Sequence, residues 1–163
     1  MYDVAKGVEI VGFSLASVPY AVTFDPYKHG RLVIGCASGR VLYASLFNEE
    51  LTVLGDRTVK EKINCTSLFT ASTQCEVVRF APPGDNSKSS HFASGHESGT
   101  VYVYHFSSST YEVIKGKPGP RGKTARVVEL RFDALSEGAR YLLVAYSTGR
   151  IGYVLDVWMG GSL

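Results

Sequence analysis

The chain has 163 residues, of which 45% are hydrophobic and 20% charged, and its formal net charge is +2. This length predicts one domain, and this composition is that of a globular chain with a sizeable core. So small a net charge does not indicate a nucleic-acid-binding protein unless basic residues cluster locally. No apolar run approaches the about 18 residues of a membrane span, so we expect no membrane-spanning segment.

The cysteine content bears on the compartment. Cys36, Cys65 and Cys75 are an odd number and lack the spacing of metal ligands. This favours a reducing compartment. The first residues also lack the basic and apolar regions of a secretory signal. We therefore expect a cytoplasmic or nuclear protein, and the sequence predicts neither a metal nor another cofactor.

The first part of the chain predicts a series of short strands. Residues 8–13 are interpreted as a first strand. In residues 20–24, Tyr20, Val22 and Phe24 lie on one face and smaller residues on the other, which predicts a half-buried strand. Pro26 ends it, because proline has no N–H for a strand ladder. Further strands are expected at 31–35, 40–46 and 51–54, followed by a longer connection over 55–74.

The same pattern then recurs twice. Phe80 and Phe132 take the place of Phe24, and a small residue stands four positions before a turn glycine in each copy: Gly35 and Gly39, Gly95 and Gly99, Ala145 and Gly149. The turn glycines are expected at positions that need a positive φ. The second copy has a fourth strand at 111–114, whereas none is expected after 150–155. An internal repeat of this kind predicts an all-β architecture of similar units.

These residues resemble the blades of WD-repeat β-propellers, in which four antiparallel strands form a blade and a tight turn joins the second strand to the third. The turn is usually Asp-Gly in that family, and the third strand often ends in Trp-Asp. Here the turn aspartate and the tryptophan are both replaced. The turns are Ser38-Gly39, Ser98-Gly99 and Thr148-Gly149, and the tryptophan position holds Ala44, Tyr104 and Val154.

The resemblance implies an all-β fold of three four-stranded antiparallel propeller-type blades. It places them in one domain, 1–163, with repeats at about 8–47, 51–106 and 111–157. Propellers close with about 4–8 blades, so three blades imply an incomplete ring. We expect another chain to complete it, either a second copy or a partner, unless the chain is part of a larger propeller.

The loop 115–126 is the one local cluster of positive charge. It could bind phosphate groups of RNA or a phosphoinositide, although a solvated loop that keeps a strand edge from pairing is the preferred interpretation. Its residues 116–124 depart from the phosphate-binding loop of nucleotide-binding enzymes, since Lys117 replaces the first glycine and two prolines remove N–H donors. Such an enzyme is therefore a remote third alternative. The basic residues are Lys115, Lys117, Arg121, Lys123 and Arg126.

No catalytic residue is assigned. The segment from Gly95 to Gly99 differs from the nucleophile elbow of hydrolases because Glu97 is its central residue, and we expect a strand–turn–strand connection there. The spacing of the histidines does not suggest a metal site, and each is expected in a loop or on the surface of a strand. They are His29, His91, His96 and His105.

The function predicted from these features is a non-enzymatic protein–protein interaction scaffold, one subunit of a multiprotein complex. The resemblance places the connections from fourth to first strands, 55–74 and 115–126, on one rim of the propeller. They are the expected contact surface, with the five basic residues as candidates for partner binding. Trp158, beyond the last strand, is a further candidate that either caps the core or anchors a partner.

Overall fold

The computed structural model describes residues 2–3, 8–9, 14–28, 30–45, 64–82, 90–116, 122, 124–133 and 141–155. Within these ranges the chain forms β-strands and turns and no α-helix, so the prediction of an all-β fold is confirmed. The same ranges contain no helix long and apolar enough to cross a bilayer.

Three antiparallel sheets carry the fold, each with its strands in chain order. The first consists of β3 (Pro19–Phe24), β4 (Arg31–Cys36), β5 (Arg40–Ser45) and β6 (Asn64–Thr70). The second consists of β7 (Cys75–Phe80), β8 (His91–His96), β9 (Val101–His105) and β10 (Thr110–Ile114). The third consists of β11 (Val127–Phe132), β12 (Tyr141–Tyr146) and β13 (Ile151–Leu155).

The three sheets share one register, as the sequence repeat predicts. The phenylalanine that ends each first strand pairs with the same position of the second strand: Phe24 with Leu32, Phe80 with Phe92 and Phe132 with Leu142. A register shift also falls at the same place in each first strand, between Pro19 and Ala21, between Cys75 and Val77 and between Val127 and Glu129. The copies are therefore equivalent residue by residue, and their environments can be compared directly.

The tight turns between second and third strands also follow the prediction. Gly39, Gly99 and Gly149 have φ of +79°, +78° and +80°, a conformation that residues with a Cβ rarely adopt. In each turn the glycine N–H donates to a carbonyl three residues earlier; for Gly99 the acceptor is His96, at 2.9 Å. The strand–turn–strand connection expected across residues 95–99 is confirmed.

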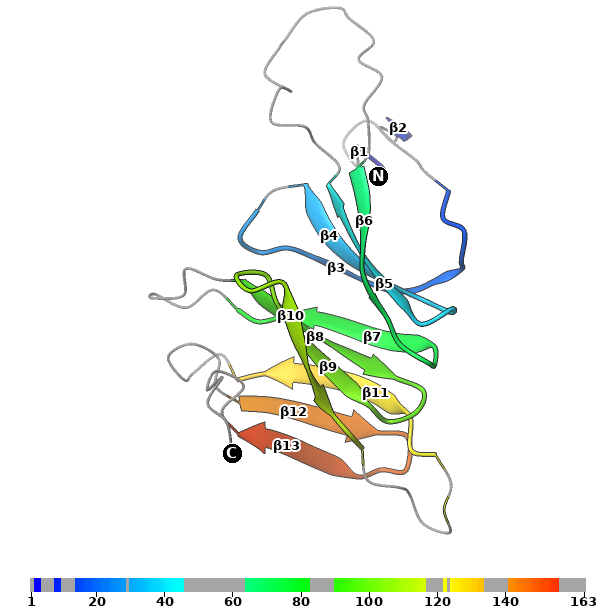
Figure 1. Cartoon of the computed structure of the whole chain (residues 1–163), viewed down its shortest axis with the longest axis vertical. Helices are drawn as coiled ribbons and strands as arrows, with labels where there is room; N and C mark the ends of the chain where they lie inside the picture. Colours follow the sequence, from blue (N-terminus) through cyan, green and yellow to red (C-terminus); the bar gives the residue numbers. More distant parts are fainter. Residues whose placement is uncertain are drawn as a thin grey trace, which may run out of the picture.

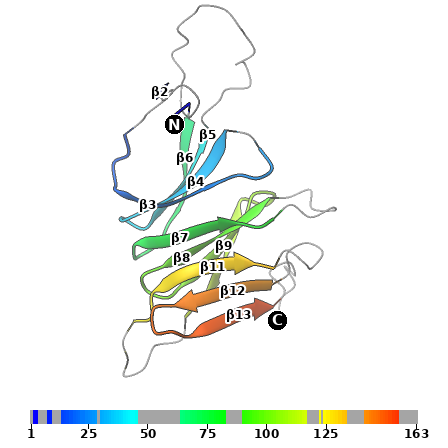
Figure 2. The same cartoon turned by 180° about the vertical axis from the view of Figure 1, so that it is seen from behind.

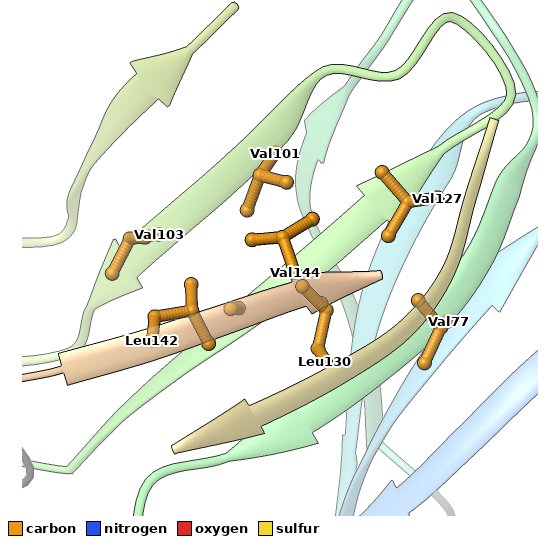
Figure 3. Packing of buried hydrophobic residues seen from close by; sticks show 8 residues of the cluster. Val77, Val101, Val103, Val127, Leu130, Leu142 and Val144 are labelled. Carbon is orange, nitrogen blue, oxygen red and sulfur yellow. The ribbon is translucent and has the colours of Figure 1, made fainter. Parts of the chain in front are cut away.

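The sheets stack one after another along the long axis of the molecule (Figures 1 and 2). Neighbouring sheets meet mainly through their first strands, since β7 contacts β3 on one side and β11 on the other. Aliphatic side chains fill the space between the second and third sheets, as Figure 3 shows for Val77, Val101, Leu130 and Val144. Aromatic side chains dominate between the first and second, where Phe69, Phe92 and Tyr104 are buried. None of the three sheets closes on itself, which is consistent with an incomplete ring.

One expectation about strands was wrong. Residues 64–70, assigned to a long connection, form β6 and pair along β5. The segment is mostly polar, and among the side chains of residues 65–70 only Phe69 is buried. It is a strand because it pairs with a neighbouring strand, and not because of its own hydrophobicity. In β3 the expected alternation is present: the side chains of Ala21 and Thr23 are half-buried, whereas the Tyr20, Val22 and Phe24 face is exposed. The reason is that the second sheet packs on the Ala21 side only.

Two further predicted strands lie wholly or partly outside the described residues. Residues 51–54 and 10–13 lie outside the described residues. Val8–Glu9, labelled β2, pairs with Tyr2–Asp3, labelled β1, in a small sheet of their own. In the described residues the third sheet has three strands, and the residues after Leu155, where a fourth would follow, lie outside the described part of the chain.

Candidate functional site

The ends of the three first strands meet at an open cleft of about 460 Å³. The strands end there for a shared reason. After each terminal phenylalanine the next backbone N–H donates to the carbonyl of the first residue of the second strand, from Asp25, Ala81 and Asp133 at 2.8, 3.0 and 2.9 Å. The three first strands therefore end at the same level, and their terminal phenylalanines all line the cleft. The cleft is lined by Thr23, Phe24, Pro26, Arg79, Phe80, Ala81, Pro82, Leu130, Arg131 and Phe132.

Hydrogen bonds fix the loop that follows β3 against the neighbouring sheet. The hydroxyl of Tyr27 donates to the carbonyl of Pro82 at 3.1 Å. The buried carboxylate of Asp25 accepts from the backbone N–H of Tyr27 at 2.8 Å and from the Tyr43 hydroxyl at 2.9 Å. Burial, assisted by Asp25, raises the pKa of Tyr43 to about 12, so this hydroxyl keeps its proton at neutral pH. The wall of the cleft is thus preformed.

Two guanidinium groups give the cleft its charge. Arg79 Nη2 lies 3.0 Å from Glu129 Oε1, an ion pair that joins β7 to β11. Arg131 lies farther from the same carboxylate, at 3.9 Å, and its side chain is 75% exposed. One carboxylate thus faces two arginines, so the cleft combines an aromatic and proline-rich lining with a positive charge. Such a surface suits a peptide with an apolar anchor and an acidic group.

Two strips of exposed apolar side chains lie at the ends of the stack. On β3, Val22 and Phe24 are 57% and 62% exposed. On the third sheet, Leu143 of β12 and Ile151 of β13 are 46% and 72% exposed. We call these surfaces the β3 face (Tyr20, Val22 and Phe24) and the β12–β13 face (Tyr141, Leu143 and Ile151). Large apolar side chains gathered on one strand or sheet, unlike single scattered ones, indicate an interaction surface.

The residues predicted to bind a partner are only partly within the described chain. Lys115 and Arg126 are exposed at the two ends of the 115–126 connection. Arg126 precedes β11, whereas the cleft lies at the opposite end of that strand, beside Phe132. The structure therefore does not bring these basic residues to the cleft. Lys117, Arg121, Lys123 and Trp158 lie outside the described residues.

The expectation that the histidines lie at the surface was wrong for two of them. His91 and His96 are 2% and 0% exposed, because both belong to β8, the second strand of the sheet that is covered on both sides. Ser94 Oγ lies 3.1 Å from His96 Nε2, and His96 Nδ1 lies 3.1 Å from the carbonyl oxygen of Thr73. The carbonyl can only accept, so Nδ1 carries the proton and Nε2 accepts from the serine hydroxyl.

This serine–histidine pair resembles a nucleophile and its base in its hydrogen bonds but not in its position. Ser94 and His96 are both fully buried, so a substrate in solution does not reach them. Burial lowers the pKa of His96, opposed by its hydrogen bonds to backbone carbonyls. The neutral ring therefore serves as an internal connection between β8 and the segment before β7.

The cysteines are thiols rather than disulfides. Cys36 and Cys75 are buried and Cys65 is exposed. Burial raises the pKa of Cys75 to about 12, which leaves almost no thiolate at neutral pH. Within the described residues no three histidine, cysteine or acidic side chains gather in a way that could hold a metal ion.

Comparison with known proteins adds no relative: no protein-family model and no curated sequence matches the chain. The surfaces described above are therefore the basis for a function. Sequence reasoning treated the three phenylalanines as markers of a repeat and missed that they line one cleft. Their recurrence at the end of equivalent strands is the signal that could have placed them together.

Proposed function

We propose that this protein is a non-enzymatic protein–protein interaction scaffold, a propeller-type subunit of a multiprotein complex related in architecture to WD-repeat proteins. The observation that carries this proposal is the exposure of apolar side chains on the outer strands at both ends of the sheet stack, with Val22 and Ile151 more than half exposed. Burying such side chains in a complex is favourable by about 25 cal/mol per Å² of apolar surface.

The three thiols support a place in the cytoplasm or nucleus, where cysteines stay reduced. The cleft between the first strands is the second contact surface of the proposed scaffold. Its arginines would bind an acidic group of a partner, while Phe24, Phe80 and Phe132 supply apolar contacts. Binding at two kinds of surface is what a subunit inside a complex requires.

The proposal is tested by tagging the chain in its own cells and quantifying the proteins that co-purify. Val22→Glu and Ile151→Glu place a charge on the β3 face and the β12–β13 face, respectively. Val113→Glu is the matched control, because Val113 is also exposed, at 47%, but lies on β10 at the edge of the middle sheet. We expect each face variant to lose proteins or copies of the chain that the control retains. Identical co-purification profiles for all four chains would contradict the scaffold function.

A further inference from the structure

Each contact between sheets inside this chain joins two different kinds of face. One kind faces the next sheet along the chain and includes Val41 on β5 and Val101 on β9. The other kind faces the preceding sheet and includes Val78 on β7 and Leu130 on β11. The shared register makes the members of each pair equivalent, since Val41 and Val101 pair with Gly35 and Gly95.

The β12–β13 face is of the first kind. Ile151 pairs with Ala145 just as Val101 pairs with Gly95, so it occupies the position of Val41 and Val101. Those two valines are 0% exposed beneath the next sheet, whereas Ile151 is 72% exposed. The third sheet thus presents the surface that the first two sheets use to bind their neighbour.

The β3 face is of the second kind. Val22 pairs with Ile34 as Val78 pairs with Ser94 and Leu130 with Val144, yet Val22 is 57% exposed whereas its two counterparts are fully buried. The β4 and β5 part of the same side is already buried together with Leu15. The exposed part of this side is therefore β3, the first strand. Elsewhere in the chain, neighbouring sheets meet mainly through their first strands.

We propose that the β12–β13 face of one copy docks on the β3 face of a second copy. This inference rests on the proposed function and names the first partner of the scaffold as the chain itself. In the described part of the chain one face of each kind is exposed, and the chain already joins these two kinds twice in its own core. In this docking, the contact between two molecules repeats the contact between neighbouring sheets of one chain, with equivalent strand positions facing each other.

The head-to-tail contact forms twice in a closed dimer, because each copy offers both faces. Head-to-tail contacts give rings when the rotation closes and filaments when it does not. In the described residues each copy has three blade-type sheets, so two copies supply six, which lies within the about 4–8 blades of closed propellers, whereas three copies supply nine and exceed that range. The occupant of the two faces is thus a single second copy.

The test uses light scattering coupled to size exclusion on the purified chain and its variants. We expect the unmodified chain to have a molar mass near twice the 17.7 kDa of one copy. Val22→Glu and Ile151→Glu should each have the molar mass of one copy, because a charge on either face disrupts both contacts of the ring. The control Val113→Glu should remain a dimer. Circular dichroism verifies that all the variants are folded, as expected for substitutions at exposed positions.

Mixing the two face variants distinguishes head-to-tail docking from any other dimer. Val22→Glu retains an intact β12–β13 face, and Ile151→Glu retains an intact β3 face. An equimolar mixture can therefore form one intact contact, and we expect a 1:1 dimer. This dimer should dissociate more readily than the unmodified dimer, which has two such contacts. A mixture that stays monomeric, face variants that remain dimeric by themselves, or an unmodified chain that is monomeric at every concentration would each overturn the proposal. In that last case, a different protein that co-purifies through Val22 and Ile151 would leave the scaffold function standing.

Discussion

Val101 and Ile151 hold the same position in neighbouring sheets, and the first is fully buried whereas the second is 72% exposed. Both are the first residues of third strands, and both pair with the small residue that precedes the turn glycine by four. The third sheet covers Val101, and no described sheet covers Ile151. The exposure of these two side chains therefore depends on whether another sheet packs over their own sheet, and not on the sequence of the strand.

The close approach of the sheets can be tested at Gly95. A Cβ at this position would lie 2.3 Å from Val127 Cγ1 and 2.7 Å from Val127 Cβ, so Gly95→Ala forces the second and third sheets apart. We expect the free energy of unfolding to fall by about 1–3 kcal/mol, the usual cost of overpacking a core. Urea denaturation measures it.

Gly152→Ala is the matched control for this substitution. Its added Cβ would meet its nearest neighbour, Tyr146, at an ordinary 3.5 Å. Its unfolding free energy should stay within about 0.5 kcal/mol of the unmodified chain. Equal effects of the two substitutions would show that the sheets do not approach each other as described.

The buried ring of His96 should make stability depend on pH. Burial lowers its pKa in the folded chain, whereas in the unfolded chain its pKa is about 6.5. Protons therefore bind the unfolded state first, so this contribution is fully present above that pH and is lost as the pH falls through it. We expect the unfolding free energy to decline on acidification, and the slope to be shallower in His96→Gln. The same slope in both proteins would contradict a neutral, buried His96.

The three thiols should react at different rates with a maleimide, because only the thiolate form attacks this electrophile. Cys65 is exposed, whereas Cys75 is buried and its pKa is raised to about 12. Peptide mapping of the native protein should find the label at Cys65 well before Cys36 or Cys75, and denaturation should make all three react. Labelling of Cys75 at the rate of Cys65 would show that the first two sheets separate in solution.

The sequence was sufficient where backbone geometry dictates the residue. Gly39, Gly99 and Gly149 were predicted to need positive φ and have it, and the strands ending at Phe80 and Phe132 were located from the repeat. The sequence also showed that a small residue recurs at Gly35 and Gly95, but it did not show why the residue must be small. Those glycines admit Cys75 and Val127 of the next sheet, a contact between segments distant in sequence.

Burial could not be predicted from alternation alone. Val22 and Val78 are the same residue in the same pattern, and one is exposed while the other is buried, because the second sheet has a neighbour on both sides. β6 escaped prediction because Cys65, Thr66 and Ser67 carry no apolar alternation and pairing with β5 makes them a strand. The cleft likewise exists only once three separate strands lie side by side.

The docking of one copy on another can be observed directly at Phe24, at the exposed end of the β3 face. A photo-crosslinking benzoyl derivative replaces this phenylalanine, and equal amounts of ¹⁴N- and ¹⁵N-labelled chains are mixed, so that peptides linked between molecules are recognised by mass. We expect mixed-isotope links from position 24 to β12 or β13, Tyr141–Tyr146 or Ile151–Leu155. Links confined to one chain, or links from β3 to β3, would contradict the account.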